Sequence, residues 1–491
     1  MVFALATTAF AAENTTISAP KGSTRTYDVY QIFTGDLYNG VLSNVKWGQN
    51  STGTVGEAVD QTILDALAAV NSKSDTEKLT VIQTYVNFGS TAIGTVSDSN
   101  PLTVTTGYYL IKDNGPVGNG EDYSLYVVQV VGPTTISPKV GTTTSDKKVD
   151  DKNDSNTTED ATTWQDSADY DIGDAVPFKL STTIAQDYAN YTHGYKLTFH
   201  DKEDAGLSFN KNSVKVYVDG TLITTGYEVV TEGLTDGCTF EVRFANLKDI
   251  ASVEAGSIIS VEYTSTLDTD ATVGSAGNKN TSHVTYTNNP NDEQAGENGE
   301  TPDDVVIVFT YQTIVNKVTK NPAYDASKDT EKTGTDSDGN KEFIPLKGAG
   351  FTLYKKNASG TYESVGSELK GEDMTTFTWS GLDDGDYKLV ETTTPSGYNT
   401  IADIEFTISA GHVDGDIPYL NTLSGNVTSG TATFTAVVND GSLSTDVVNN
   451  SGAQLPSTGG IGTTIFYVLG SVLVIGAAVL LVTKKRMSTK G

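Results

Sequence analysis

Hydrophobic residues follow two different periods in the first part of the chain. Apolar side chains occupy both faces of a predicted strand at residues 27–33, and short apolar strands resume at residues 108–111 and 125–128. Between these strands, from residue 56 to 89, apolar residues recur at helical spacing and predict two helices. We therefore expect an α+β domain over residues 13–140.

Beyond this domain the hydrophobic period is two. Val214, Val216 and Val218 alternate with polar neighbours, as do the apolar residues from Ile259 to Tyr263. Short strands of this kind, bounded by Asp-Gly and Gly turns, predict an antiparallel β-sandwich over residues 141–300. A further strand-rich unit is expected over residues 301–450, so the fold class is mainly β.

Two predicted strands place a carboxylate on an apolar face. The residues that share these faces are Tyr195, Leu197 and Phe199 with Asp201, and Tyr387 and Leu389 with Glu391. Because side chains alternate along a strand, each carboxylate points where its apolar neighbours point. A buried, unpaired charge is costly, so both groups are expected to be neutral or to have partners.

Composition narrows the classes of function. The 32 basic and 62 acidic residues give a net charge of −30, which argues against nucleic acid or an anionic membrane surface as a partner. The single cysteine, Cys238, excludes an intramolecular disulfide. No cofactor or metal is expected, since the histidines show no ligand spacing. No hydrolase constellation is apparent, so we do not expect an enzyme.

Both ends of the chain carry targeting patterns. Residues 1–12 are apolar and end in a small-x-small pattern, which indicates the remnant of a signal peptide. Residues 451–491 contain Leu455-Pro456-Ser457-Thr458-Gly459, an uncharged run at 461–482 and a basic tail at 483–491. The run is long enough to cross a bilayer, and the tail is expected to stay on the cytoplasmic side.

The order of pentapeptide, apolar span and basic tail resembles the cell-wall sorting signal of Gram-positive surface proteins. That resemblance implies cleavage by a sortase between Thr458 and Gly459, so that the mature, secreted protein is anchored to peptidoglycan and keeps no membrane helix. The alternative is an ordinary single-pass anchor with a chance LPSTG sequence.

Two stretches resemble Gram-positive major pilins. Residues 30–36 with Trp47-Gly48 resemble their N-terminal domain, and residues 387–398 match the YxLxETxxPxGY motif, or E-box, of Cna B-type sandwich domains. Residues 346–354 also look like the second strand of that domain. The resemblance implies tandem immunoglobulin-like, Cna-type β-sandwiches that form autocatalytic isopeptide bonds.

In that family a carboxyl promotes a bond between a lysine on the first strand and an asparagine on the last. For the C-terminal domain this implies Glu391 as the catalytic carboxyl, Lys317 as the amine and Asn449 as the acceptor, with Asn450 as an alternative. Lys347 lies past the first strand and is expected at the surface. Burial keeps such an amine unprotonated and such a carboxyl protonated, which the reaction needs.

The same logic applied to the middle domain assigns Asp201 as the catalytic carboxyl. Lys148 is the expected amine, although the register also permits Lys147. Asn280 is the expected acceptor in preference to Asn288, because it shares a face with the apolar residues of the last predicted strand. No set of crosslinking residues is assigned in the first domain.

Lys139 follows Pro138 in the connector between the first two domains, where the pilin motif of the family carries its nucleophilic lysine. The resemblance implies that a pilus sortase joins Thr458 of one subunit to Lys139 of the next, and that a housekeeping sortase attaches the last subunit to peptidoglycan. The expected function is a structural subunit of a covalent surface pilus, with tip or minor pilins and host surface ligands as further partners. The alternative is a wall-anchored monomeric adhesin, which needs no such lysine.

Overall fold

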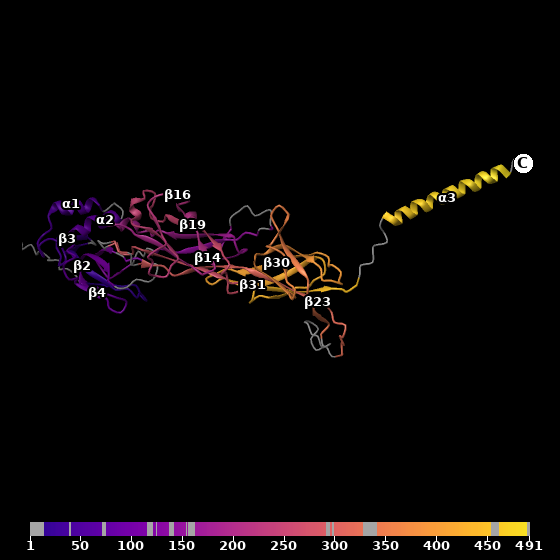
Figure 1. The fold of residues 1–491 in the computed structure, drawn as a ribbon. Coiled ribbons are helices and arrows are strands. Elements are labelled where there is room, and N and C mark those ends of the chain that lie inside the picture. Colours follow the sequence, from indigo (N-terminus) through magenta and orange to yellow (C-terminus); the bar gives the residue numbers. More distant parts are fainter. Residues whose placement is uncertain are drawn as a thin grey trace, which may run out of the picture.

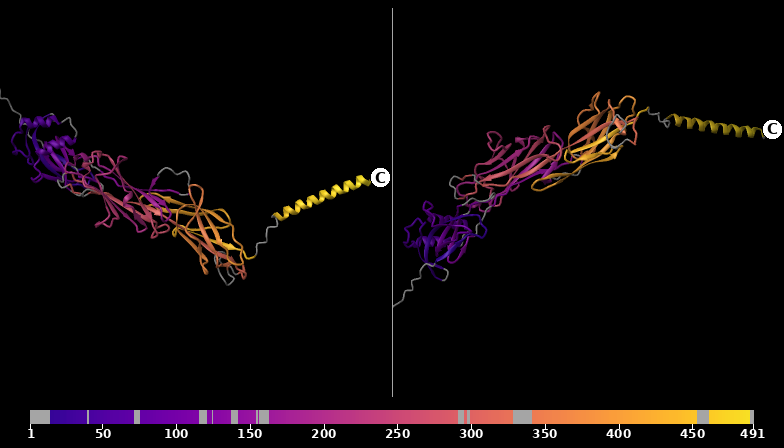
Figure 2. Two further views of the ribbon diagram at one scale, coloured as in Figure 1. Left: turned by 45° about the horizontal axis from the view of Figure 1, so that its top comes forward. Right: turned by 90° about the horizontal axis from the view of Figure 1, so that it is seen from below.

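The computed structural model describes residues 14–488 with internal gaps. The gaps are residues 39–40, 71–74, 115–120, 124, 137–141, 154, 156–162, 291–294, 297–298, 328–340 and 453–460. The described residues are mainly β, as predicted. Three groups of sheets follow one another along one axis, and a single helix stands apart beyond the last of them (Figures 1 and 2).

The first group combines two small sheets with two helices, as the mixed period predicted. Strand β2 has both faces buried: Val29 packs in one cluster with Ile17, and Ile32 packs in another with the apolar sides of the helices. Asp60 caps the first helix by accepting a hydrogen bond of 2.8 Å from the Thr62 N–H. The elements are β1 (Asn14–Ser18), β2 (Tyr27–Tyr38), β3 (Val41–Trp47), α1 (Gln61–Ala69), α2 (Asp75–Ile82), β4 (Gly94–Val96), β5 (Leu102–Thr105), β6 (Gly107–Asp113), β7 (Leu125–Val130) and β8 (Thr134–Thr135).

The second group is a sandwich of two seven-stranded sheets. Their facing side chains form one core, in which Val216, Val261, Phe199 and Val284 are buried. One sheet contains β9 (Asp146–Asp150), β10 (Trp164–Gln165), β12 (Ala175–Thr183), β14 (Leu207–Phe209), β15 (Lys215–Val218), β16 (Thr221–Ile223) and β19 (Ile258–Leu267). The other contains β11 (Ser167–Asp169), β13 (Leu197–Glu203), β17 (Glu228–Val230), β18 (Phe240–Phe244), β20 (Asn278–Tyr286), β21 (Gly299–Glu300) and β22 (Asp304–Phe309).

The third group is a second sandwich, around a core that includes Phe351, Trp379 and Phe406. One sheet contains β23 (Tyr311–Lys320), β24 (Phe343–Pro345), β28 (Thr376–Leu382), β32 (Thr435–Val437) and β33 (Ser442–Asn449). The other contains β25 (Gly350–Lys356), β26 (Tyr362–Ser364), β27 (Leu369–Lys370), β29 (Gly385–Thr393), β30 (Ile404–Val413) and β31 (Tyr419–Ser429).

The change from one sandwich to the next falls later than the predicted boundary at residue 300. Strand β22 pairs with β20 in the middle sandwich, and β23 opens the next sandwich only two residues after β22 ends. The reason is that β22 serves both cores. Val306 and Val308 pack in the middle core, whereas Ile307 and Phe309 pack in the following one.

The C-terminal helix α3 (Ile461–Ser488) contains the predicted apolar run. Its window Val468–Lys485 has a mean hydropathy of 1.9 and is not buried against the rest of the protein. Length and composition suffice for a membrane span. Residues 1–13, which hold the expected signal-peptide remnant, lie outside the described part of the chain.

Candidate functional site

The first and last strands of the C-terminal sandwich lie side by side. Strands β23 and β33 pair in parallel, with Lys317 opposite Val447 and Thr319 opposite Asn449. Residues two apart share a face of the sheet, so the Lys317 and Asn449 side chains both point into the core. Glu391 reaches the same place from β29 in the facing sheet.

These three side chains contact one another in the interior. The Lys317 Nζ lies 3.0 Å from Glu391 Oε1 and donates a hydrogen bond to Asn449 Oδ1. The Asn449 Nδ2 donates to Glu391 Oε1 and Oε2, at 3.0 and 3.2 Å. The side chains of Lys317 and Glu391 are fully buried, and Asn449 is 0% exposed. Three residues predicted from distant parts of the sequence therefore form one buried cluster.

The surroundings of this cluster favour a reactive amine. Burial lowers the pKa of Lys317, and the neighbouring Glu391 charge opposes this only in part. The Phe351 ring lies 5.3 Å from the Lys317 Nζ and helps to exclude water. Glu391 is oriented from outside the cluster by the Ile401 N–H, which donates to its Oε2 at 3.0 Å. In this geometry the carboxyl contacts the amide nitrogen of Asn449, and the amide oxygen of Asn449 contacts the lysine.

In the middle sandwich, the structure places Lys147 in the core and Lys148 on the outside, contrary to the preferred assignment. Lys147 is 0% exposed, whereas the Lys148 side chain is 29% exposed and forms an ion pair with Asp166. The pairing of β9 with β12 sets this register, with Val149 opposite Phe178 and Lys147 opposite Leu180 on the buried face. Lys147 occupies the position that the sequence left as the alternative.

Lys147 meets the predicted carboxyl across the sandwich. Its Nζ lies 2.5 Å from Asp201 Oδ2 and 3.0 Å from the Tyr263 hydroxyl. Burial lowers the pKa of Lys147 and raises the pKa of Asp201, whose neighbouring lysine charge works in the opposite direction. As predicted from the strand period, Asp201 is fully buried on the face that also carries Leu197 and Phe199.

Asn280 joins this cluster through Tyr263. The tyrosine hydroxyl donates to Asp201 Oδ2 at 2.8 Å and accepts from Asn280 Nδ2 at 2.8 Å. Glu203 adds a second carboxyl at 3.4 Å from Asn280 Nδ2, and burial raises the pKa of Glu203 to about 8. Asn288, the other candidate acceptor, lies beyond the end of β20, so the geometry favours Asn280.

Sequence reasoning missed Tyr263 and Glu203. Tyr263 follows Ile259 and Val261 on the inner face of β19, and the pattern alone assigns it to the apolar core. Glu203 follows Asp201 at a spacing of two on β13, so a second buried carboxyl was visible in the same alternation. The remaining predicted site residues, Lys139 and the pentapeptide 455–459, lie outside the described residues.

Two groups of potential metal ligands come together within the described residues. They are His200 with Asp236 and Cys238, and Asp169 with Asp383 and Asp384. Both draw on strands and loops that are far apart in sequence, so no short motif could have indicated them. In the first group His200 Nδ1 is already 2.8 Å from Asp236 Oδ2, and its Nε2 is 2.8 Å from Thr285 Oγ1.

Comparison with known families identifies two segments. Residues 327–421 match the family model SpaA, a prealbumin-like fold domain, and residues 447–488 match the LPXTG cell wall anchor motif. The second match covers the predicted pentapeptide, the span and residues 483–488 of the basic tail. It supports the expected cell-wall localisation.

Individual proteins are similar to this chain to different extents. The trypsin-resistant surface T6 protein of Streptococcus pyogenes serotype M6 is 27% identical over 58% of this chain and 60% of its own length. This chain thus spans about 60% of that curated relative. The solved T6 backbone pilin of serotype M6 Streptococcus pyogenes is 18% identical, with a TM-score of 0.50 over 90% of this chain and 98% of its own. The major pilin SpaD of Corynebacterium diphtheriae is 16% identical, with a TM-score of 0.45 over 90% and 98%.

The fold and the anchor motif define a class of protein: a cell-wall-anchored surface protein built of tandem β-domains. Within that class, the expected resemblance to sortase-assembled Gram-positive backbone pilins is confirmed. This chain shares its fold with the T6 backbone pilin.

Proposed function

We propose that this protein is the shaft subunit of a covalent surface pilus. In this proposal a sortase cleaves after Thr458 and transfers its carbonyl to the Lys139 amine of a neighbouring subunit. The last subunit of the fibre is transferred to peptidoglycan instead. The anchor-motif match and the fold shared with a backbone pilin support the proposal.

The structural observation that most strongly supports the proposal is the buried cluster of Lys317, Glu391 and Asn449. A pilus shaft transmits tension along each subunit, from Lys139 to Thr458. Lys317 and Asn449 are 132 residues apart in sequence and lie on the first and last strands of the C-terminal sandwich. A covalent bond between them would keep tension from peeling those strands apart, as disulfides do in other secreted proteins.

The proposed bond forms in one turnover. The neutral Lys317 Nζ attacks Asn449 Cγ, the new C–N bond closes, and the bond from Cγ to Nδ2 breaks to release ammonia. Glu391 lies within hydrogen-bond distance of both nitrogens, so it can take the proton that the amine loses and deliver it to the departing nitrogen. Packing holds the reacting groups together in a dry site.

For the middle sandwich we propose the same reaction between Lys147 and Asn280, with Asp201 as the carboxyl. Tyr263 lies between the carboxyl and the amide, and its hydroxyl contacts both of them. It can therefore relay the proton from Asp201 towards Asn280 Nδ2. The protein itself acts as a sortase substrate and as a structural subunit, with no multiple-turnover chemistry.

Replacing Lys139 tests the polymer directly. Boiled, wall-released extracts of cells that express the Lys139→Ala variant are expected to show only monomer on an immunoblot, where the unaltered protein gives a ladder of high-mass species. The reason is that the isopeptide linkage between subunits survives boiling, and the variant lacks its acceptor amine. The matched control is Lys152→Ala, which removes an exposed lysine that follows β9 in the middle sandwich.

The possible outcomes separate the two candidate functions. Monomer in both the unaltered protein and the Lys139→Ala variant would contradict the pilus and leave a wall-anchored adhesin. A ladder in both would keep the pilus and move the nucleophile to another lysine. A ladder that is lost in Lys152→Ala but not in Lys139→Ala would assign that role to Lys152.

A further inference from the structure

The reaction proposed for the middle sandwich leaves one acidic side chain of the site without a role. Glu203 lies at the end of β13, two residues after Asp201, so both carboxyls point to the same side of the sheet. The pairing of β13 with β20 places Glu203 directly opposite Asn280, whereas Asp201 lies opposite Ser282. Residues directly opposite each other are the closest neighbours across two antiparallel strands. The register therefore brings Glu203, rather than Asp201, next to the acceptor amide.

The contacts of Asn280 follow this register. Its Nδ2 lies 3.4 Å from Glu203 Oε1 and 2.8 Å from the Tyr263 hydroxyl. Among the described residues, no hydrogen bond joins Asn280 to Asp201, which instead contacts the Lys147 amine at 2.5 Å. The nitrogen that would leave thus contacts one carboxyl, and the nitrogen that would attack contacts another.

The C-terminal sandwich offers a single carboxyl to both nitrogens. Glu391 Oε1 lies 3.0 Å from the Lys317 Nζ and 3.0 Å from the Asn449 Nδ2. In the middle sandwich, the carboxyl beside the amine belongs to an aspartate, whose side chain is one methylene shorter. Glu203 supplies the contact with the amide nitrogen that Asp201 does not make.

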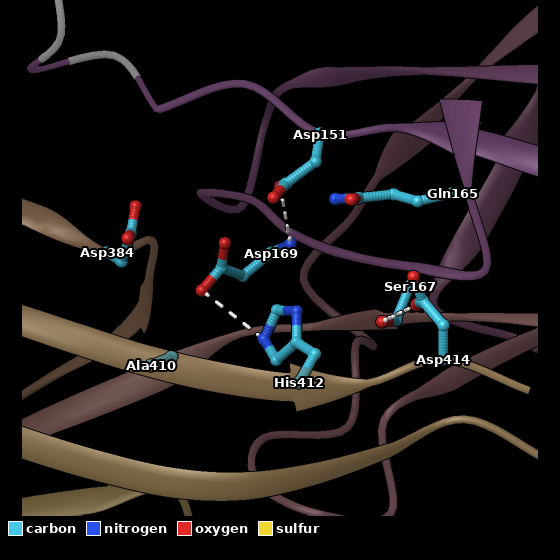
Figure 3. Close-up of a pocket in the computed structure, with 8 residues that line it drawn as sticks. All are labelled: Asp151, Gln165, Ser167, Asp169, Asp384, Ala410, His412 and Asp414. Atoms are coloured by element: carbon cyan, nitrogen blue, oxygen red, sulfur yellow. Dashed lines mark hydrogen bonds and ion pairs between the residues drawn. The ribbon is translucent and has the colours of Figure 1, made fainter. Parts of the chain in front are cut away.

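The surroundings of Glu203 favour its neutral form. Three buried carboxyls of the two sandwiches lie beside a basic nitrogen: Glu391 beside Lys317, Asp201 beside Lys147, and Asp169 beside His412 (Figure 3). Glu203 Oε1 accepts a hydrogen bond from Ser265, whereas its Oε2 is buried without a partner among the described residues. Burial and the Asp201 charge raise the pKa of Glu203 to about 8, although Ser265 and the Lys147 charge act in the opposite direction. Glu203 therefore holds a proton at neutral pH.

We propose that Glu203 is the general acid of the bond-forming reaction in the middle sandwich, a role that rests on the Lys147–Asn280 bond proposed above. The lone pair of the neutral Lys147 Nζ attacks Asn280 Cγ, and the proton that Nζ loses passes to Asp201. As the bond from Cγ to Nδ2 breaks, Nδ2 keeps its electron pair, takes the proton of Glu203 and leaves as ammonia. The products are the amide bond, a protonated Asp201 and an ionised Glu203, so no further reagent is needed.

Glu203 offers a shorter route for this proton than Tyr263. Burial and the neighbouring carboxyls raise the pKa of the Tyr263 hydroxyl well above its ordinary value. The hydroxyl can therefore give a proton to Asn280 only while it takes another from Asp201, which makes two transfers. Glu203 delivers its proton in one transfer, and in this assignment Tyr263 positions the amide.

The rate of bond formation at different pH values tests the assignment. The full-length chain is synthesised in a cell-free system below and above the pKa of Glu203, and the loss of ammonia between Lys147 and Asn280 is followed by mass spectrometry of the crosslinked peptides. We expect the rate to fall as the pH rises through about 8, because ionised Glu203 has no proton to give. Deprotonation of Lys147 would raise the rate instead, since the neutral amine is the nucleophile.

One substitution and one control make the test specific. Glu203→Gln keeps the size of the side chain and an oxygen that can accept from Ser265, but it has no acidic proton. We expect it to slow formation of the bond about a hundredfold or more and to abolish the fall with pH. The bond should still appear on long incubation, because the site remains assembled. Glu232→Gln changes an exposed acid beyond β17 in the same sandwich and should form the bond at the unaltered rate.

The results that would overturn the assignment differ from those that would overturn the bond. An unaltered rate in Glu203→Gln would leave the relay through Tyr263 as the route. Complete loss of the bond in Glu203→Gln, without a fall of the rate with pH in the unaltered protein, would show that Glu203 is only structural. Absence of ammonia loss in the unaltered protein would overturn the Lys147–Asn280 bond itself and this role with it, whereas the test of polymerisation with Lys139→Ala would stand.

Discussion

Replacing Glu391 with alanine is expected to leave Lys317 and Asn449 unjoined. The carboxyl contacts both reacting nitrogens, and within the described residues it is the acidic side chain that reaches them. Without it, the proton of the attacking amine cannot pass to the leaving ammonia. Intact-mass measurement should then find the variant heavier by one ammonia than its substitution alone predicts.

The loss of this bond should lower stability strongly. Lys317 and Asn449 are 132 residues apart, and a crosslink that closes a loop of this size contributes about 5 kcal/mol in the chain-entropy model. For a domain of this length, that corresponds to a fall in the unfolding temperature of the C-terminal sandwich of about 15 °C. Differential scanning calorimetry of the full chain would record the fall.

Two further variants control this experiment. Glu391→Gln keeps the size and the hydrogen bonds of the side chain but cannot carry the proton, so it should also lack the bond. Lys347→Ala removes an exposed lysine that pairs with Asp373 at the surface, and it should keep both the bond and the stability. If the mass of Glu391→Ala showed that ammonia had still been lost between Lys317 and Asn449, the role assigned to Glu391 would be refuted.

In the C-terminal sandwich, the burial of Glu391 could be predicted from a broken pattern, whereas the roles of Lys317 and Asn449 were implied by the resemblance to Cna B-type domains. Glu391 interrupts the apolar alternation of Tyr387 and Leu389, and the structure buries all three on one face of β29. Lys317 and Asn449 likewise lie in alternating strands at the two ends of the domain. The period of a strand fixes which face a residue takes, so burial follows from sequence alone.

The crosslinking lysine of the middle sandwich was harder to predict because the first strand begins with adjacent charged residues. In Asp146-Lys147-Lys148, period two allows either lysine to face the core, and only the register against β12 decides between them. The polar role of Tyr263 could not be predicted, for a different reason. It occupies a core position where an aromatic residue is ordinary, and its polar role depends on partners from β9, β13 and β20.

Neither the boundary between the sandwiches nor the cluster of Asp169, Asp383 and Asp384 could be predicted from the sequence. No turn residue marks the boundary within the run Val305-Val306-Ile307-Val308-Phe309. The two faces of this run are buried against different cores. Asp169 and Asp383 come from separate domains, and their approach depends on how the domains dock. Such long-range pairings lie beyond what local hydrophobic patterns encode.

Replacing Lys147 with alanine is expected to remove the proposed bond in the middle sandwich, whereas replacing Lys148 is not. Lys147 Nζ lies in the core with Asp201 and Tyr263, whereas Lys148 pairs with Asp166 at the surface. Lys147 and Asn280 are 133 residues apart, one more than the C-terminal pair, so the loss of their bond also costs about 5 kcal/mol. The surface variant should change stability by less than about 1 kcal/mol.

Mass and stability together decide between the two lysines. The Lys147→Ala variant should be heavier by one ammonia than its substitution alone predicts, because one bond fewer has formed. The unfolding temperature of the middle sandwich should fall, whereas that of the C-terminal sandwich should stay the same. Asp201→Asn should reproduce the mass effect with the lysine still present, which separates lost chemistry from a lost side chain. If Lys148→Ala alone lost the ammonia deficit, the core position of Lys147 would have to be structural, with Asp201 neutralised by an unreacted ammonium.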